Sequence, residues 1–133
     1  MKEEQSPRFE NVMIIDDNLI DLYISSRMIT KNNFGKKVLQ YSSAKEALKY
    51  LQENIPQLPE VVFVDIYMPG MPGFEFMKEY DKLSTPLKNL CSVFIISSSI
   101  DEQDLTCAHK DENIVAMKEK PISKESLANI RLS

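Results

Sequence analysis

The sequence predicts an α/β fold: a doubly wound parallel sheet of five strands alternating with five helices, of the (βα)5 kind. Short runs of apolar, β-branched residues alternate along the chain with segments whose apolar residues recur at helical spacing. Three of the runs are apolar at consecutive positions, which is typical of strands covered on both faces. Right-handed crossovers between such strands build an open sheet with helices on both sides.

The composition fits one ordinary soluble globular domain. The chain has 133 residues, of which 43% are hydrophobic and 27% charged, enough to build a single core. A formal net charge of −4 argues against binding nucleic acid through its phosphates. The polar start MKEEQSPRFE has no apolar stretch of a secretory signal, and no run reaches membrane-spanning length. We therefore expect a cytoplasmic protein whose partners are other proteins, with neither a membrane nor nucleic acid among them.

The five predicted strands follow in order along the chain. They are NVMIID (11–16), KKVLQY (36–41), VVFVD (61–65), SVFIIS (92–97) and the weaker NIVAM (113–117). The two cysteines, Cys91 and Cys107, lack the spacing of a zinc site or a disulfide framework, so we expect free thiols.

The first two helices are predicted from apolar side chains that share one face. We expect these faces to point inward: Ile20, Tyr23, Ile24 and Met28 in the first helix, and Ala44, Ala47, Leu48 and Leu51 in the second. Asp17 or Asn18 could cap the start of the first helix. Ser43 followed by Glu46 is a capping-box signal for the second.

Three further helices complete the pattern. The third is expected over 73–83, closed by the pair Thr85-Pro86, with four apolar side chains inward: Phe76, Met77, Tyr80 and Leu83. Asp101 and Ser123 are predicted N-caps of the fourth and fifth helices.

Acidic side chains stand where two of the predicted strands end. Asp16 and Asp17 end the first strand and Asp65 ends the third. The carboxyl ends of parallel strands meet at one edge of a sheet, so these carboxylates converge if the two strands are neighbours. Three carboxylates so close repel one another and require a cation. Oxygen ligands with room for water suit Mg²⁺ better than a soft metal.

The same edge has the parts of a phosphoryl site. Ser97 ends the fourth strand and Lys120 follows the fifth. A carboxylate next to a metal ion and an ammonium can attack phosphorus, which makes Asp65 the candidate nucleophile. The Ser97 hydroxyl could bond a phosphoryl oxygen. Single acids at strand ends often only cap the next helix, but the combination favours phosphoryl chemistry.

Four segments carry a resemblance to a known family: "MIIDDN", "DIYMPGMPGFEF", "FIISSSIDEQD" and "KEKPIS". With them the chain resembles, over about residues 10 to 132, the CheY-like receiver domain of two-component response regulators. The resemblance implies a flavodoxin-like sheet with strand order 2-1-3-4-5. It also implies an N-terminal tail over 1–9 and a receiver domain over 10–133.

The resemblance also implies roles for the acidic residues. Asp65 would be the phosphoacceptor, taking the phosphoryl group from the phosphohistidine of a histidine kinase. Asp16, Asp17 and Asp65 would hold Mg²⁺ together with the backbone carbonyl of Tyr67. Tyr67 and Ser99 match positions that tune phosphoryl lifetime through access of water.

Further positions match the phosphoryl-binding and switch elements of the family. Ser97 and Lys120 would bind the phosphoryl group, and a cis bond is expected between Lys120 and Pro121. Met68, Pro69 and Gly73 would shape the loop after the acceptor. Met117 departs from the family pattern, because the switch position three residues before the lysine usually holds Tyr or Phe. Met can follow a shift in packing but offers neither ring nor hydroxyl.

The resulting hypothesis is a Mg²⁺-dependent signalling module rather than an enzyme. Because the sequence ends directly after the fifth helix, we expect a stand-alone receiver. Its partners would be a histidine kinase or histidine phosphotransfer protein and a downstream protein of unknown identity. Output would be phosphorylation-dependent protein binding, through the face of helix four, strand five and helix five, or a phosphorelay; dimerisation on phosphorylation stays open.

Two alternatives remain. One is an aspartate-nucleophile phosphohydrolase of small metabolites, but the D-x-D of that class is absent, since Asp65 is followed by Ile66 and Tyr67. The other is a pseudo-receiver that binds partners without phosphate. It is disfavoured by the joint presence of four residues: Asp17, Asp65, Ser97 and Lys120.

Overall fold

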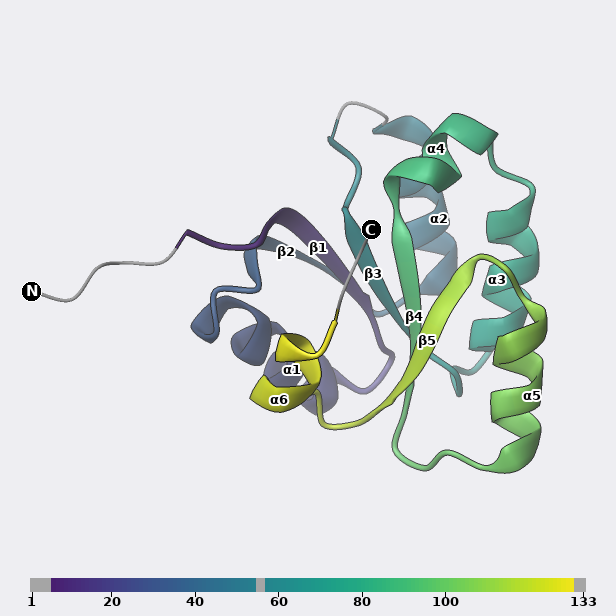
Figure 1. Ribbon diagram of the computed structural model, residues 1–133. Helices are drawn as coiled ribbons and strands as arrows, with labels where there is room; N and C mark the ends of the chain where they lie inside the picture. Colours follow the sequence, from purple (N-terminus) through teal and green to yellow (C-terminus); the bar gives the residue numbers. More distant parts are fainter. Residues whose placement is uncertain (1–5, 55–56, 131–133) are drawn as a thin grey trace, which may run out of the picture.

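The protein is a five-stranded parallel sheet covered by helices on both faces (Figure 1). The computed structural model describes residues 6–54 and 57–130. The strand order is β2-β1-β3-β4-β5, as the family resemblance implied. The strands are β1 (Phe9–Ile15), β2 (Gly35–Tyr41), β3 (Val61–Asp65), β4 (Ser92–Ser97) and β5 (Ile114–Glu119). Residues 1–5 of the predicted tail and 131–133 of the predicted domain lie outside the described residues.

The strand bounds differ slightly from those predicted. β1 begins at Phe9 and ends at Ile15, so that Asp16 is the first residue beyond the strand. β5 runs to Glu119 and therefore includes Met117 and the polar residues after it. Because β5 pairs only with β4 and forms an edge of the sheet, charged side chains on it are tolerated.

Six helices are found in the described part of the chain, one more than predicted: α1 (Leu19–Lys31), α2 (Ala44–Glu53), α3 (Gly73–Asp81), α4 (Thr85–Leu90), α5 (Glu102–Lys110) and α6 (Lys124–Ala128). The predicted caps are confirmed at four of them. Side-chain oxygens of Asn18, Ser43, Asp101 and Ser123 accept backbone N–H groups of the following turn.

The additional helix α4 begins at the pair that was expected to close the preceding helix. Ser84 Oγ accepts a hydrogen bond from the backbone N of Leu87, and Pro86 lies in the first turn. Pro is well tolerated there because the N–H it lacks has no partner within the helix. α3 accordingly ends at Asp81, and Leu83 is only partly buried.

The sheet separates two apolar cores. α1 and α6 lie on one face of the sheet and α2 to α5 on the other (Figure 1). Alternate residues of β1 point into the two cores. Met13 and Ile15 pack in the core with α2 and α3, while Val12 and Ile14 pack in the core with α1 and α6. All four side chains are fully buried, as expected of a central strand in a parallel sheet.

The predicted inward face of α1 is wrong. Ile20 is 71% exposed and Tyr23 62% exposed, and Ile24 is also exposed. The buried side chains of α1 are instead Leu22, Ser25, Ser26 and Ile29. Small serines allow the helix to approach the sheet closely, and Ser26 satisfies its hydroxyl by donating to the Leu22 carbonyl at 2.8 Å. The apolar side chains do share one face of α1, but that face is exposed.

In the described part of the chain, none of the helices has both the length and the apolar content needed to cross a membrane. Cys91 is buried and Cys107 exposed, both as free thiols, as predicted.

Candidate functional site

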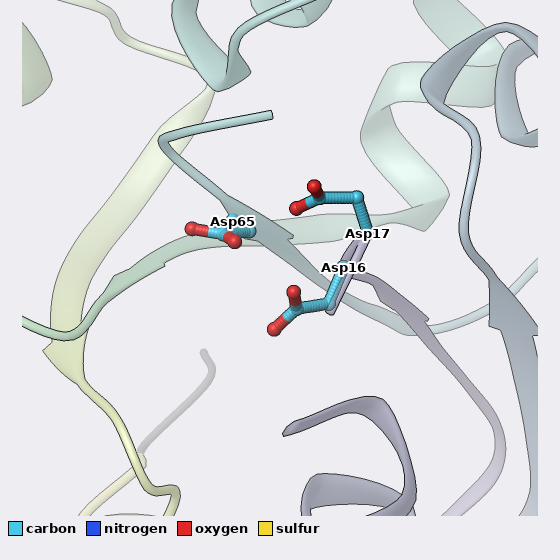
Figure 2. A group of neighbouring side chains, drawn as sticks. All are labelled: Asp16, Asp17 and Asp65. Carbon is cyan, nitrogen blue, oxygen red and sulfur yellow. The ribbon is translucent and has the colours of Figure 1, made fainter. Parts of the chain in front are cut away.

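Three carboxylates gather at the carboxyl ends of two neighbouring strands. β1 and β3 pair in register with Ile15 opposite Val64, so the residues that follow, Asp16 and Asp65, lie side by side. Asp16, Asp17 and Asp65 each offer an oxygen, and these oxygens lie within 4.8 Å of one another. Figure 2 shows the three side chains leaving the two strand ends. The convergence predicted from the strand ends is thus observed.

Backbone N–H groups hold the two buried carboxylates. Asp16 is fully buried, and its Oδ1 accepts from the backbone N of Asn18 at 2.9 Å. Asp65 is 4% exposed, and its Oδ1 accepts from the backbone N of Tyr67 at 3.2 Å. Asp17 is exposed. The cluster therefore has two buried acids, each held by a backbone N–H, and one exposed acid.

The Lys120 ammonium lies among the acids. Its Nζ is 2.9 Å from Asp16 Oδ2, 2.9 Å from Asp21 Oδ2 and 3.2 Å from Asp65 Oδ2. Asp16 and Asp65 are among the predicted site residues. Asp21, in the first turn of α1, was not among the predicted site residues. The sequence does contain a signal for Asp21. Because α1 starts immediately after the acid pair, an acid in its first turn lies close to the end of β1.

Burial and charge oppose each other at Asp65 and Lys120. Burial raises the pKa of Asp65 to about 6; the Tyr67 N–H and Lys120 lower it, and the neighbouring Asp16 charge adds to the rise. At Lys120, burial alone would lower the pKa, but the hydrogen bonds to Asp16 and Asp21 raise it above its ordinary value. Lys120 therefore stays charged.

The donor set fits Mg²⁺. Asp16, Asp21 and Asp65 contact one ammonium, and Asp17 lies in the same cluster as Asp16 and Asp65, so the cluster carries an excess of negative charge. The ligands are all oxygens, and the exposed Asp17 leaves an open side where water can complete the coordination of a small, hard cation. The pocket thus has the chemistry that a divalent cation requires.

The end of β4 lies beside Lys120. Ser97 is fully buried, and its carbonyl accepts from the backbone N of Lys120 at 2.7 Å. The Ser97 hydroxyl donates to the Ser99 carbonyl at 2.6 Å and accepts from the Ser99 backbone N at 3.3 Å. Met117 is partly buried against the core that contains α2, α3 and α5. The role of Met117 as a switch stays a prediction.

The loop after Asp65 packs closely against the backbone of that residue. Met68 is buried and Pro69 exposed. A Cβ at Gly73 would lie 2.7 Å from the Asp65 carbonyl oxygen, because the start of α3 lies against the backbone of Asp65. The Lys120–Pro121 bond is cis, as expected.

Comparison with known proteins defines the class. Residues 12–131 match the family model of the response regulator receiver domain, and the chain belongs to this family. The putative two-component response regulator ARR13 of Arabidopsis thaliana is 32% identical over 123 residues, covering 90% of this chain and 20% of that protein. The probable histidine kinase 6 of Oryza sativa subsp. japonica is 34% identical over 70 residues, 53% of this chain and 7% of that protein.

Solved structures agree with the fold. The crystal structure of a two component response regulator from Cytophaga hutchinsonii superposes with a TM-score of 0.85 at 25% identity, covering 91% of this chain and 92% of that one. The chain is a receiver of two-component signalling with the CheY-like fold.

Proposed function

We propose that Asp65 accepts a phosphoryl group from the phosphohistidine of a histidine kinase or histidine phosphotransfer protein. The observation that carries the proposal is the position of Asp65: a buried carboxylate within 4.8 Å of two other acids and 3.2 Å from the Lys120 ammonium. Such a carboxylate is a nucleophile whose surroundings compensate the charge of an arriving phosphoryl group. The receiver family supports the same role.

The transfer is a displacement at phosphorus. An oxygen of Asp65 attacks the phosphorus atom, the P–N bond of the donor breaks, and its electron pair leaves with the imidazole nitrogen. Lys120 offers an N–H to a phosphoryl oxygen, and Ser97 can offer its hydroxyl after releasing the Ser99 carbonyl. Hydrolysis removes the phosphoryl group. Water attacks the phosphorus atom, inorganic phosphate leaves and the Asp65 carboxylate is restored.

Mg²⁺ would be held by Asp16, Asp17 and Asp65, with the Tyr67 backbone carbonyl as a further ligand. When bound, it would neutralise charge on the transferring phosphoryl oxygens. Residues of the chain itself hold the carboxylates in position. Asn18 and Tyr67 fix the carboxylates of Asp16 and Asp65 through their backbone N–H groups.

The exposed apolar face of α1 is the proposed docking surface for the phosphohistidine-bearing helix of the donor. The face consists of Leu19, Ile20, Tyr23 and Ile24. Its continuity with the acceptor pocket supports this occupant, because α1 starts two residues after Asp17 and its Asp21 contacts Lys120. Ile20→Ser should slow transfer from a phosphohistidine protein and leave the rate with acetyl phosphate unchanged.

Output by protein binding would use the face formed by α5, β5 and α6, which are the predicted fourth helix, fifth strand and fifth helix. Leu105 on α5 is 37% exposed and Val115 on β5 is 51% exposed. These side chains offer apolar contacts to a partner. Phosphorelay, dimerisation, the stand-alone organisation, the division at residues 9 and 10 and the cytoplasmic location stay predictions.

The test is phosphorylation by a small-molecule donor. Acetyl phosphate with Mg²⁺ should add one phosphoryl group to the wild-type chain, and none to Asp65→Asn, as measured by intact mass. The matched control Asp81→Asn removes an exposed acid from α3 and should be phosphorylated normally. Continuous release of phosphate from many small esters, without a stable adduct, would indicate a phosphohydrolase instead. Absence of any adduct on the wild-type chain would indicate a pseudo-receiver.

A further inference from the structure

The Lys120 ammonium has three N–H donors, and the structure provides a carboxylate for each. Asp16, Asp21 and Asp65 accept at 2.9, 2.9 and 3.2 Å. The Lys120 side chain is 9% exposed, so its charge depends on these partners for compensation. Asp16 and Asp65 are predicted to bind metal and phosphoryl, whereas Asp21 has no assigned role.

Asp21 differs from the other two partners in its surroundings. Its side chain is 36% exposed, against 0% for Asp16 and 6% for Asp65. Asp16 and Asp65 each also accept a backbone N–H. Among the described residues, the side chain of Asp21 accepts from Lys120 alone. Its carboxylate is therefore available to hold the ammonium throughout the reaction.

The backbone of Asp21 is held by the N-cap of α1. Its N–H donates to the Asn18 side chain at 3.0 Å, and Asn18 is the N-cap of α1. Asn18 in turn donates its own N–H to Asp16. One short turn thus sets the spacing between Asp16 and Asp21, the two carboxylates on either side of the lysine.

We propose that Asp21 is a positioning residue: together with Asp16 it holds two donors of the Lys120 ammonium, so that the third points at Asp65 and the phosphoryl group that Asp65 receives. Lysine needs such guidance because its ammonium ends a flexible four-carbon stem and its donors rotate freely. The inference rests on the proposed function for its purpose, but the contact itself can be tested without phosphorylation.

The first test observes the ammonium directly in the unphosphorylated protein. NMR of ¹⁵N-labelled lysine side chains should show a slowly exchanging Lys120 ammonium signal, identified by its loss in Lys120→Met. Asp21→Asn, which keeps the shape and removes the charge, should speed its exchange with water by about tenfold. The control Glu46→Gln removes the corresponding first-turn acid of α2, which is exposed, and should leave the signal unchanged.

The second test measures the rate of Asp65 phosphorylation by acetyl phosphate at a fixed, saturating Mg²⁺ concentration. Asp21→Asn should slow it about fivefold and Glu46→Gln by less than about twofold. In a Lys120→Met background, Asp21→Asn should have no further effect, because the group it positions is gone.

The outcomes separate the two proposals. If acetyl phosphate failed to phosphorylate the wild-type chain, the proposed function would be wrong. The NMR result would still decide whether Asp21 holds the Lys120 ammonium. Unchanged Lys120 exchange in Asp21→Asn would overturn the inference. Equal slowing in the presence and absence of Lys120 would overturn it as well, since Asp21 would then act by another route.

Discussion

The Tyr67 hydroxyl donates a 3.0 Å hydrogen bond to Asp104 Oδ2, joining the loop after the acceptor to the first turn of α5. Asp104 is itself fixed, since its backbone N donates to the N-cap Asp101 at 2.8 Å. The bond to Asp104 raises the pKa of Tyr67 above its ordinary value, because the carboxylate favours the protonated phenol. The loop after Asp65 and the start of α5 are thereby joined.

We predict that loss of the hydrogen bond between Tyr67 and Asp104 shortens the lifetime of the phosphorylated state. Tyr67→Phe and Asp104→Ala should each speed hydrolysis of the Asp65 phosphate by about threefold, because the freed loop admits water. Loss of acyl phosphate after removal of the donor measures the rate. The double variant should be no faster than either single one, and Glu102→Ala, on the same turn of α5, should match the wild type. Additive effects would show that the two residues act independently.

The two glycines of the acceptor loop should respond differently to alanine. At Gly73 a Cβ would meet backbone atoms, the Asp65 oxygen at 2.7 Å and the Ile66 Cα at 2.8 Å. Gly73→Ala should therefore lower the free energy of unfolding by about 2–3 kcal/mol and impair phosphorylation. Urea unfolding and phosphorylation by acetyl phosphate measure the two effects.

Gly70 provides the matched control. Its backbone has φ +84° and no atom of the described residues lies within 4 Å of an added Cβ, so Gly70→Ala should cost only about 1–2 kcal/mol from backbone strain. It should leave phosphorylation nearly intact. A larger loss for Gly70→Ala than for Gly73→Ala would contradict the packing described here.

The strand ends could be predicted from the sequence more reliably than the helix faces. Consecutive apolar residues in β1, β3 and β4 signal strands buried on both sides, and an acid or hydroxyl at their end marks the sheet edge. Convergence of Asp16 and Asp65 follows only if β1 and β3 are neighbours, and that adjacency was implied by the family resemblance rather than by the strand patterns. The prediction failed at α1, where Ile20 and Tyr23 face outward, because periodicity finds an apolar face without showing which partner covers it.

Two further features have no unique sequence signal. The pair Thr85-Pro86 can end a helix or begin one, and only the capping bond from Leu87 to Ser84 decides. Asp21 is a first-turn acid, which usually serves the helix dipole alone. Its contact with Lys120 joins residues separated by 99 positions, so it depends on tertiary structure.

Removing the buried charge should stabilise the metal-free protein in a pH-dependent way. Because burial raises the pKa of Asp65 to about 6, the folded chain keeps a proton that the unfolded chain loses near pH 4. The stability this group contributes is full below about pH 4 and is lost as the pH rises through about 6. Asp65→Asn should therefore gain about 1–3 kcal/mol over the wild type between pH 4 and 7.

Urea unfolding in the presence of a chelator measures this difference. Added Mg²⁺ should reduce it, since the cation favours the ionised carboxylate of the wild type. A difference between the two proteins that is independent of pH would show that the Asp65 carboxyl titrates normally.

Asp17→Asn should weaken Mg²⁺ binding without unfolding the chain. Asp17 is the exposed member of the three acids, and its loss relieves repulsion in the metal-free state. We expect a loss of affinity of about tenfold or more by titration calorimetry, with an unchanged or higher free energy of unfolding. Glu46→Gln should bind Mg²⁺ as the wild type does. Normal binding by Asp17→Asn would remove Asp17 from the ligand set.

The most direct test of the central claim is the location of the phosphoryl group. Borohydride reduces an aspartyl phosphate to homoserine, so treatment after reaction with acetyl phosphate and Mg²⁺ marks the modified position permanently. Peptide mass spectrometry should find homoserine at position 65 and at no other aspartate. Modification at Asp16, Asp17 or Asp21, or a stable adduct that survives in Asp65→Asn, would contradict the account.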